Sequence, residues 1–301
     1  MEKVVLIGLG AVGLTYAVKL RDKCDLSVLA DKERLERYTK NKPVFNGVEQ
    51  DFNYILPTEK FDADLIIIAT KSSGLESAIK SIRNFVSGKT RIISLINGVS
   101  SEEKISKAYP KAKVLKSYFI GHSAVRRANF VKQDGIGEIV IEQDDFMESF
   151  FTRAGIDYSV PDDIDYAMWL KFAFNSFANP ISAILNMNFG ELKKNKALKR
   201  FARNVIYEVC QIAKKKGIKN TNRLGPEAIK SLDRMCDEGM TSMHQDILSR
   251  RPTEIDIFCG ETIKTGKKYG IKTPYNQILY DLIKIKEEDN ENSIHPCQGR
   301  E

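Results

Sequence analysis

The sequence predicts an α/β protein in which a doubly wound, mostly parallel N-terminal sheet is followed by an all-α C-terminal domain. Short apolar runs alternate with helical patterns in the first half, the β signal fades after about Pro161, and long helical patterns fill the rest. The runs are rich in Val and Ile and nearly continuous, as in strands that are buried on both faces. The 301 residues suit two domains, which we expect at residues 1–162 and 163–301.

The first expected strand, Val4–Ile7, leads directly into glycines with the spacing G-x-G-x-x-G, and an amphipathic helix pattern follows. This context is typical of a Rossmann-type dinucleotide site. Gly8 would permit the tight turn, Gly10 would let the backbone touch a pyrophosphate, and Gly13 would let helix and strand pack closely. The same glycines could serve the turn alone. The predicted cofactor loop consists of Gly8, Leu9, Gly10, Ala11, Val12 and Gly13.

Five further strands are expected in the first domain, at Leu26–Leu29, Leu65–Ala69, Ile92–Ile96, Val114–Ile120 and Ile139–Ile141. Asn97 follows the fourth strand, at the edge where open α/β sheets place ligand-binding loops. Asn97 is therefore a candidate binding residue, although a plain turn would also account for it.

The second domain is expected to contain helices at Tyr166–Ala178, Ala197–Lys216, Pro226–Asp237, Thr253–Tyr269 and Tyr275–Lys286. Three glycines act as stop signals between these patterns: Gly217, Gly239 and Gly270. Pro226 and Pro252 stand where helices are expected to begin. Glu254 follows the second of these starts, where a carboxylate could simply be stabilised by the helix dipole. The polar segment Glu287–Glu301 is expected to fray.

The segment Trp169–Pro180 contains a polar constellation. Lys171, Asn175 and Asn179 fall at i, i+4 and i+8, so on one helix they form a stripe among large apolar side chains. A solvent-facing stripe would be the simplest explanation, but asparagine is a poor helix former, and two asparagines at matching positions cost stability. Pro180 disfavours helical geometry at Asn179, so the helix should end or kink there. We interpret the stripe as functional.

Composition and charge argue against several classes of protein. The net charge is +7, but the lysine runs lie on helical patterns without interleaved aromatics, as on solvated faces, so no nucleic-acid partner is expected. Five scattered cysteines without C-x-x-C, together with three histidines, favour neither a disulfide framework nor a metal site. No apolar run approaches the ~20 residues that span a bilayer, and glycines interrupt the N-terminal apolar segment, unlike a signal peptide. We expect a metal-independent, cytoplasmic enzyme with no membrane partner.

Together these segments resemble the ketopantoate reductase (2-dehydropantoate 2-reductase) family over nearly the whole chain. The similarity is carried by the glycine motif, T-K at Thr70-Lys71, I-N-G at Ile96–Gly98, K-x-x-x-N-x-x-x-N-P at Lys171–Pro180, and S-M-x-Q-D followed by T-E-I-D. The resemblance implies an oxidoreductase that converts 2-dehydropantoate to (R)-pantoate with hydride from a nicotinamide cofactor, in pantothenate and coenzyme A biosynthesis. It favours NADP(H) as cofactor and a small-molecule 2-keto acid as substrate.

The resemblance also implies roles for single residues. Lys171 would be the general acid that protonates the ketone oxygen, which fits because partial burial lowers a lysine pKa toward neutral pH. Glu254 would hold the substrate hydroxyl and poise Lys171. The other matched positions would bind the carboxylate and hydroxyl groups of the substrate (Asn97, Asn175, Asn179 and Ser242) or the cofactor (Lys71 and Asn97).

One departure from the family pattern concerns the cofactor. Asp31 stands where the family usually has an arginine that grips the 2′-phosphate of NADPH. An acidic residue about 20 residues beyond the glycines is the group that binds a ribose 2′-hydroxyl in NAD enzymes. NAD(H) is therefore possible, although Lys32 and Arg34 could still meet a phosphate.

A second departure is the segment Gly121–Asp134, an unusual version of the loop after the fifth strand, in which His122, Arg126 or Arg127 could alter the substrate scope. Two other functions stay open. The chain could be a reductase of another branched 2-keto acid, or a non-enzymatic nicotinamide-nucleotide sensor, which would need neither a catalytic lysine nor its carboxylate. A homodimer is possible, but no apolar patch can be identified from the sequence.

Overall fold

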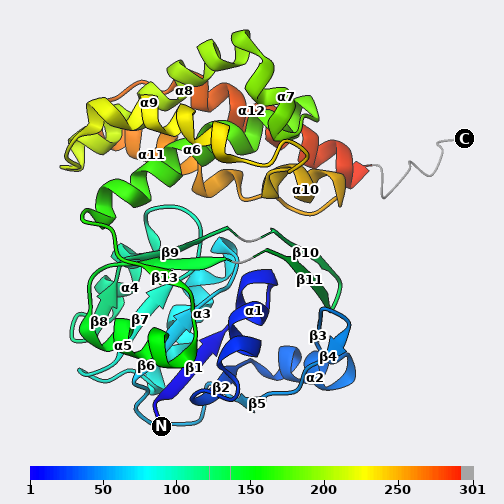
Figure 1. The fold of residues 1–301 in the computed structure, drawn as a ribbon, viewed down its shortest axis with the longest axis vertical. Coiled ribbons are helices and arrows are strands. Elements are labelled where there is room, and N and C mark those ends of the chain that lie inside the picture. Colours follow the sequence, from blue (N-terminus) through cyan, green and yellow to red (C-terminus); the bar gives the residue numbers. More distant parts are fainter. Residues whose placement is uncertain (122, 136, 293–301) are drawn as a thin grey trace, which may run out of the picture. The chain divides into compact units, whose positions relative to one another are not determined.

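The computed structural model describes residues 1–121, 123–135 and 137–292, and it divides the chain into two compact units, Met1–Ile164 and Asp165–Glu301. The first unit is built around a sheet and the second is built from helices (Figure 1). The predicted fold class, an N-terminal Rossmann-type sheet with a helical C-terminal domain, is confirmed.

Six parallel strands form the main sheet of the N-terminal unit. In spatial order they are β5 (Asn53–Ile55), β2 (Asp25–Leu29), β1 (Lys3–Ile7), β6 (Leu65–Ile68), β7 (Arg91–Ser94) and β8 (Lys113–Leu115). The chain runs outward from β1 to one edge and then from β6 to the other. The direction of this progression therefore reverses between β1 and β6, which makes that point the topological switch where doubly wound sheets bind ligands.

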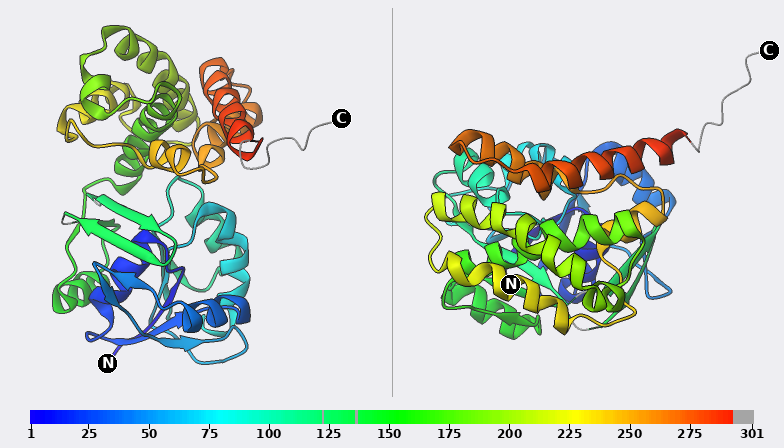
Figure 2. Two further views of the ribbon diagram at one scale, coloured as in Figure 1. Left: turned by 90° about the vertical axis from the view of Figure 1, so that its right-hand side faces the viewer. Right: turned by 90° about the horizontal axis from the view of Figure 1, so that it is seen from above.

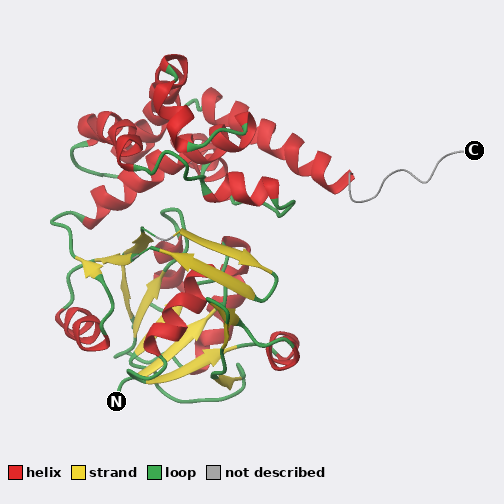
Figure 3. Ribbon diagram, turned by 45° about the vertical axis from the view of Figure 1, so that its right-hand side comes forward, coloured by secondary structure: helices red, strands yellow, loops and turns green. Residues whose placement is uncertain are grey.

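Helices cover both faces of this sheet (Figure 3). Val4 and Leu6 of β1 belong to the core that includes α1 (Ala11–Leu20) and α5 (Asp145–Ala154). Val5 and Ile7 belong to the opposite core, with α3 (Leu75–Ser81) and α4 (Ser101–Ala108). Because successive strand residues point to opposite faces, two covered faces require the continuous apolar runs seen in the sequence.

The prediction of a single strand at Val114–Ile120 is wrong. The chain forms β8 and then β9 (Ser117–Ile120), which leaves the main sheet and pairs antiparallel with β12 (Glu138–Ile141). With β13 (Tyr158–Ser159), these strands make a separate three-stranded sheet. Local periodicity does not reveal the change of partner, because a strand that switches sheets keeps the same β pattern.

A small four-stranded sheet was not expected. It contains β10 (Ser123–Arg127), β11 (Phe130–Asp134), β3 (Val44–Phe45) and β4 (Val48–Glu49), in that order. The segment Gly121–Asp134 is thus largely an antiparallel hairpin. His122 lies outside the described residues, and Arg126 and Arg127 are placed only by their backbone on β10. Between β2 and β3 lies α2 (Lys32–Lys40), and short 3₁₀ helices flank α3 at Ser72–Gly74 and Ile82–Asn84.

Helices make up the C-terminal unit over the residues that are described. They are α6 (Ile164–Leu185), α7 (Phe189–Lys194), α8 (Lys196–Lys215), α9 (Thr221–Ser231), α10 (Ser242–Leu248), α11 (Cys259–Tyr269) and α12 (Pro274–Asn292). Short 3₁₀ helices lie at Leu232–Arg234 and Ile255–Ile257. The central helix α8 packs against α9, α11 and α12, as two further views show (Figure 2).

Of the two outcomes expected at Asn179, an end or a kink, the end does not occur, because helix α6 continues through Pro180. Pro180 lacks the N–H that would donate to the carbonyl of Ser176. The thiol of Cys259 donates to that carbonyl instead, with Sγ and O 3.6 Å apart. A tertiary contact therefore satisfies the backbone acceptor that the proline leaves behind.

Two other helix starts also differ from the expectation. Pro226 lies inside α9, which begins at Thr221; the carbonyl that loses its donor belongs to Asn222, which is exposed and can bond water. Pro252 precedes an irregular stretch and the 3₁₀ helix Ile255–Ile257, and the α-helix α11 begins only at Cys259.

The stop signals at Gly217 and Gly270 are confirmed, since both residues have positive φ, at +86° and +70°. Of the segment expected to fray, Glu287–Glu301, the part up to Asn292 is helical, and residues 293–301 lie outside the described residues. Glu287 anchors this part of α12 to the segment before α11, because it accepts a hydrogen bond from the Thr253 N–H at 2.7 Å. Glu287 also accepts one from Lys284 Nζ, on the same helix, at 3.0 Å. In the part of the chain that the structure describes, no helix has the length and apolarity that crossing a bilayer requires.

Candidate active site

The glycine turn between β1 and α1 forms a cradle with no room for side chains. A β-carbon on Gly13 would lie 1.8 Å from the carbonyl oxygen of Gly8, and one on Gly8, whose φ is +101°, would lie 2.7 Å from the carbonyl oxygen of Ala69. Gly10 is the N-cap residue of α1, and no side chain makes a capping hydrogen bond there. The first N–H groups of α1 are therefore available to a phosphate. Leu9 packs in the core, so only its backbone can contribute.

Thr70 and Lys71 follow β6, on the other side of the switch point. The hydroxyl Oγ1 of Thr70 is buried and has no hydrogen-bond partner. Lys71 is the N-cap of the 3₁₀ helix Ser72–Gly74. A glycine cradle, a helix N-terminus and an unsatisfied buried hydroxyl beside it together fit the phosphates and ribose of a dinucleotide.

Asp31 has a structural role at the start of α2. It is the N-cap of α2: Oδ1 accepts a hydrogen bond from the Arg34 N–H at 2.8 Å, and Oδ2 pairs with Arg34 Nη1 at 3.0 Å. Both side chains are about half exposed, at 48% for Asp31 and 40% for Arg34. The guanidinium that could have met a 2′-phosphate is thus already paired with a carboxylate.

Asn97 lies in the turn after β7 and is partly exposed. The turn is made by the next residue, Gly98, whose φ is +102°. A glycine at this φ supplies the tight turn, so the turn itself does not require Asn97.

Lys171 lies on α6 in the C-terminal unit, where burial changes its acid–base properties. Although its side chain as a whole is half buried, the ammonium is enclosed by protein, and burial lowers the pKa of Lys171 to about 7. The negative charge of Glu254 opposes this shift and raises the pKa. Desolvation disfavours the charged form of a lysine, and a nearby carboxylate favours it. The structure therefore brings together two residues that are far apart in the sequence.

Glu254 does not begin a long helix. It precedes only the 3₁₀ helix Ile255–Ile257 and makes no side-chain capping hydrogen bond there. A helix-dipole role is correspondingly weak, because the dipole of a single turn is small. The negative charge of Glu254 instead favours the protonated form of Lys171, whose pKa it raises.

Asn179 and Ser242 are joined directly. Asn179 is 4% exposed, and its Oδ1 accepts hydrogen bonds from Ser242 Oγ and from the Met243 N–H, both at 3.2 Å. A second contact, between Ser182 Oγ and Thr241 Oγ1 at 2.5 Å, also links α6 to α10. One member of the polar stripe, Asn179, therefore helps to fix the start of α10.

The remaining member of the stripe, Asn175, lies on α6 one turn from both Lys171 and Asn179, and it is partly exposed. One wall of the C-terminal unit thus presents an ammonium, two amides and a hydroxyl, which are groups that bind a carboxylate and a carbonyl or hydroxyl oxygen. Sequence reasoning missed the contact between Ser182 and Thr241, because serine and threonine are common and no spacing connects residues in separate helices.

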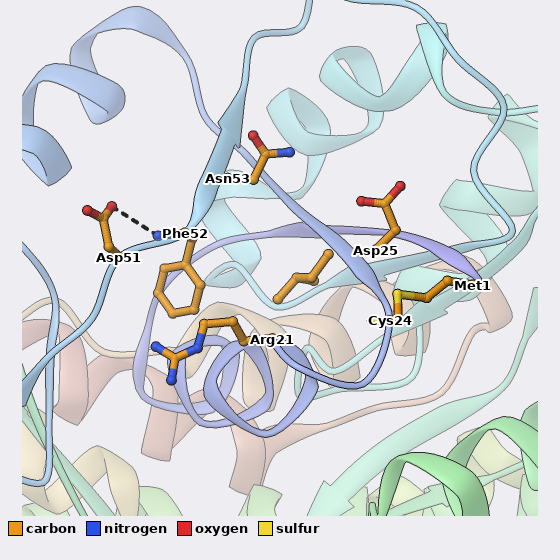
Figure 4. Close-up of a pocket in the computed structure, with 8 residues that line it drawn as sticks. Met1, Arg21, Cys24, Asp25, Asp51, Phe52 and Asn53 are labelled. Atoms are coloured by element: carbon orange, nitrogen blue, oxygen red, sulfur yellow. Dashed lines mark hydrogen bonds between the residues drawn. The ribbon is translucent and has the colours of Figure 1, made fainter.

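A hollow lies elsewhere, in the N-terminal unit (Figure 4). It has a volume of about 600 Å³ and is lined by Met1, Arg21, Cys24, Asp25, Leu26, Asp51, Phe52 and Asn53. Asp25 and Asn53 are the first residues of β2 and β5. The hollow therefore lies at the amino ends of these strands, opposite the edge at which parallel sheets bind ligands. In the described ranges no three or more His, Cys, Asp or Glu side chains form a group that could hold a metal ion.

Comparison with known proteins matches both units. The family described as ketopantoate reductase PanE/ApbA matches residues 4–145, and its C-terminal part matches residues 163–287. The 2-dehydropantoate 2-reductase of Pyrococcus horikoshii is 29% identical over 299 residues, covering 95% of this chain and 97% of that protein. The enzyme of the same name from Aquifex aeolicus is 28% identical over 302 residues, with 95% and 97% covered.

Two solved structures are similar over nearly the whole chain. The ternary structure of D-mandelate dehydrogenase with NADH and anilino(oxo)acetate has a TM-score of 0.84 and 25% identity, covering 96% of this chain and 99% of that one. The putative 2-dehydropantoate 2-reductase from Enterococcus faecalis has a TM-score of 0.71 and 26% identity, also covering 96% and 99%.

Proposed function

Because the chain belongs to the ketopantoate reductase family, we propose that it reduces 2-dehydropantoate to (R)-pantoate with a nicotinamide cofactor, as a step of pantothenate and coenzyme A biosynthesis. The observation that carries this proposal is the enclosed ammonium of Lys171, with a pKa of about 7, on the same helix as Asn175 and Asn179. A general acid is most effective when its pKa lies near the working pH.

In this proposal Lys171 donates its proton to the ketone oxygen of the substrate. The bound cofactor supplies the hydride to the carbonyl carbon. Glu254 keeps a sufficient fraction of Lys171 protonated, because its charge raises the lysine pKa against the effect of burial. Lys171 therefore stabilises the oxygen as negative charge develops on it and then neutralises it.

The substrate's carboxylate and hydroxyl would be bound by Asn175, Asn179 and Ser242, and Asn97 stays a candidate for the same groups. The Oδ1 of Asn179 already accepts two hydrogen bonds, so its Nδ2 is the atom left to donate to a substrate oxygen. A site built to hydrogen-bond a hydroxyl rejects analogues that lack it, because its own polar groups are then left unpaired.

For the cofactor we propose a preference for NADH, held at the cradle of Gly8, Gly10 and Gly13 and near Lys71. The family as a whole favours NADP(H), but Asp31 places a carboxylate where a 2′-phosphate would lie, and its partner Arg34 is paired with it. A solved relative at 25% identity carries NADH. Asp31→Ala is expected to reduce the KM ratio of NADPH to NADH at least about fivefold, since it removes a like-charge repulsion of roughly 1 kcal/mol.

The decisive experiment follows the loss of the reduced cofactor's absorbance with 2-dehydropantoate and either NADH or NADPH. Lys171→Ala is expected to lower kcat about 10²–10⁴-fold while the cofactor Kd stays unchanged. Turnover of Lys171→Ala at the wild-type rate would reject the assigned role. Oxidation of neither cofactor by the wild-type protein would favour a nicotinamide-nucleotide sensor.

A second candidate function is the reduction of another 2-keto acid, and the similarity to D-mandelate dehydrogenase favours one with an aromatic substituent. Comparison of kcat/KM for 2-dehydropantoate and phenylglyoxylate separates the two. Assembly into a homodimer stays a prediction, which sedimentation equilibrium of the full chain would test.

A further inference from the structure

Glu102 is a buried acid that the proposed site does not use. It is the second residue of α4 and only 8% exposed. Its Oε2 accepts a hydrogen bond from Ser101 Oγ at 3.0 Å. Its Oε1 is shielded from solvent and has no hydrogen-bond partner. One carboxyl oxygen in the interior of the N-terminal unit therefore lacks a donor.

The protonation of Glu102 is poised close to neutral pH. Burial raises the pKa of Glu102 to about 7, while its hydrogen bonds and the positive charge of Lys116 act in the opposite direction. Lys116 lies between β8 and β9 and is the charged side chain whose field acts on this carboxyl. A donor placed at Oε1 would favour the ionised form and lower the pKa further.

The position of Glu102 indicates what that donor is. The turn Asn97–Gly98 and the start of α4 follow β7, so Glu102 lies at the carboxyl edge of the main sheet. A dinucleotide bound at the switch point lies across this edge, with one half on each side of it. Asp31, after β2, stands where the adenosine ribose is bound. The nicotinamide half is then directed to the side of β6, β7 and β8, where Glu102 lies.

We propose that Glu102 positions the nicotinamide ring by accepting, at Oε1, a hydrogen bond from the N–H of its carboxamide. The proposal rests on the proposed use of a nicotinamide cofactor. Since Oε1 is shielded, a donor that reaches it is enclosed by protein as well, and a hydrogen bond in such an environment is strengthened by the low local dielectric. The carboxamide fixes which way the ring turns, so this bond would orient the reacting carbon.

The first experiment measures the Kd of NAD⁺ by isothermal titration calorimetry over a pH range on both sides of 7, for the full chain and for Glu102→Gln. NAD⁺ carries no 2′-phosphate to titrate. Because Lys171 also titrates near pH 7, both proteins carry Lys171→Ala. The affinity of the parent, which is the chain with Lys171→Ala alone, is expected to rise with pH by up to about tenfold per unit below the pKa of Glu102 and to level off above about pH 7. Glu102→Gln is expected to bind several-fold more weakly at about pH 8 and to lose the pH dependence.

Glu103→Gln is the matched control, because Glu103 is the next residue on α4 and is exposed. It is expected to keep both the affinity and the pH dependence of the parent. Glu102→Gln should also keep or raise the melting temperature at about pH 8, because it removes a buried carboxylate; a purely structural role would lower that temperature. An unchanged pH dependence in Glu102→Gln would overturn the proposal and leave an internal water as the partner of Oε1.

A second probe tests the carboxamide itself. The parent is expected to bind the nicotinic acid analogue of NAD⁺, which has a carboxylate in place of the amide, at least tenfold more weakly than NAD⁺, and Glu102→Gln should narrow this difference because glutamine can donate to a carboxylate. Equal binding of the two dinucleotides by the parent would overturn the assignment. A parent that binds neither NAD⁺ nor NADH would instead contradict the proposed function.

Discussion

Lys171 and Glu102 show how burial sets chemistry at the scale of single residues. In both cases the enclosing protein disfavours the charged form, so a lysine and a glutamate with very different ordinary pKa values both titrate at about 7. The charged partner differs in sign: Glu254 acts on the lysine, and Lys116 acts on the glutamate. Such perturbed groups cluster at functional sites, which is why these two carry our proposals.

The reduction rate should depend on pH through Lys171. As a general acid, Lys171 is active when protonated, so kcat/KM for reduction is expected to fall by about tenfold per pH unit above about 7. Glu254→Gln removes the charge that raises this pKa, so its profile should move to lower pH. Rates measured in constant-ionic-strength buffers test both statements, and a profile that stays in place in Glu254→Gln would contradict the coupling.

At the scale of elements, hydrogen bonds between helices supply partners for backbone groups that the helices themselves leave unpaired. Asn179 and Ser182 of α6 hold the start of α10, and Cys259 at the start of α11 satisfies the carbonyl that Pro180 leaves without a donor in α6. Helix termini carry unsatisfied backbone groups, and a buried terminus needs partners from elsewhere in the chain. The C-terminal unit meets this requirement through contacts between helices.

Glu208 of α8 is the clearest case and gives a stability prediction. It is 5% exposed and accepts hydrogen bonds from the N–H groups of Tyr275 and Asn276 at 2.9 and 3.0 Å, and from Asn276 Nδ2 at 2.7 Å. Glu208→Ala removes the acceptor of these three donors at the start of α12, of which, among the described residues, only Asn276 Nδ2 has another, the Val205 carbonyl, and it is expected to destabilise the protein by about 3 kcal/mol. Urea unfolding measures this loss, with the exposed Glu288→Ala on α12 as control; equal stability of the two variants would be the contrary result.

The turn between β1 and α1 gives a second prediction at this scale. Gly13→Ala would place a β-carbon 1.8 Å from the carbonyl oxygen of Gly8. The turn must open, so cofactor affinity is expected to fall by at least about 100-fold, as for a loss of roughly 3 kcal/mol. Gly88→Ala is the matched control, because its nearest atom would be 3.9 Å away. Fluorescence titration of NADH checks both variants, and tight binding by Gly13→Ala would contradict the cradle.

At the scale of the whole molecule, the chain forms two units that meet once along the sequence, at Ile164 and Asp165. The N-terminal unit has its own cores on the two faces of the main sheet. Each unit is made from one continuous stretch of sequence. Compact units of this size with their own cores can unfold as separate cooperative transitions.

Cofactor binding should therefore stabilise one unit selectively. The cradle belongs entirely to the N-terminal unit, so NADH at about 100 times its Kd is expected to stabilise that unit by about 2.7 kcal/mol. Calorimetry with hydrogen exchange to assign the transitions checks this, and protection should be strongest in β1 and α1. A uniform rise in hydrogen-exchange protection across residues of both units would mean that the two units unfold together.

The sequence by itself determined the alternation of strands and helices in the first unit, the glycine turn with its tight approach, and the placement of Lys171, Asn175 and Asn179 on one helix. These features follow from period, from the absence of a β-carbon and from residue spacing, which are local properties of the chain. The family followed from the combination of several such motifs.

The tertiary structure decided what depends on residues far apart in the sequence. Asn179 pairs with Ser242, 63 residues away, Glu254 acts on Lys171, and β9 pairs outside the main sheet. Helix α6 continues through Pro180, and Cys259 donates to the carbonyl that the proline leaves without its helical donor. The unpaired oxygen of Glu102 is likewise visible only after folding. Burial and hydrogen-bond satisfaction are properties of the packed chain, since the cost of a proline, a charge or a polar atom depends on what surrounds it.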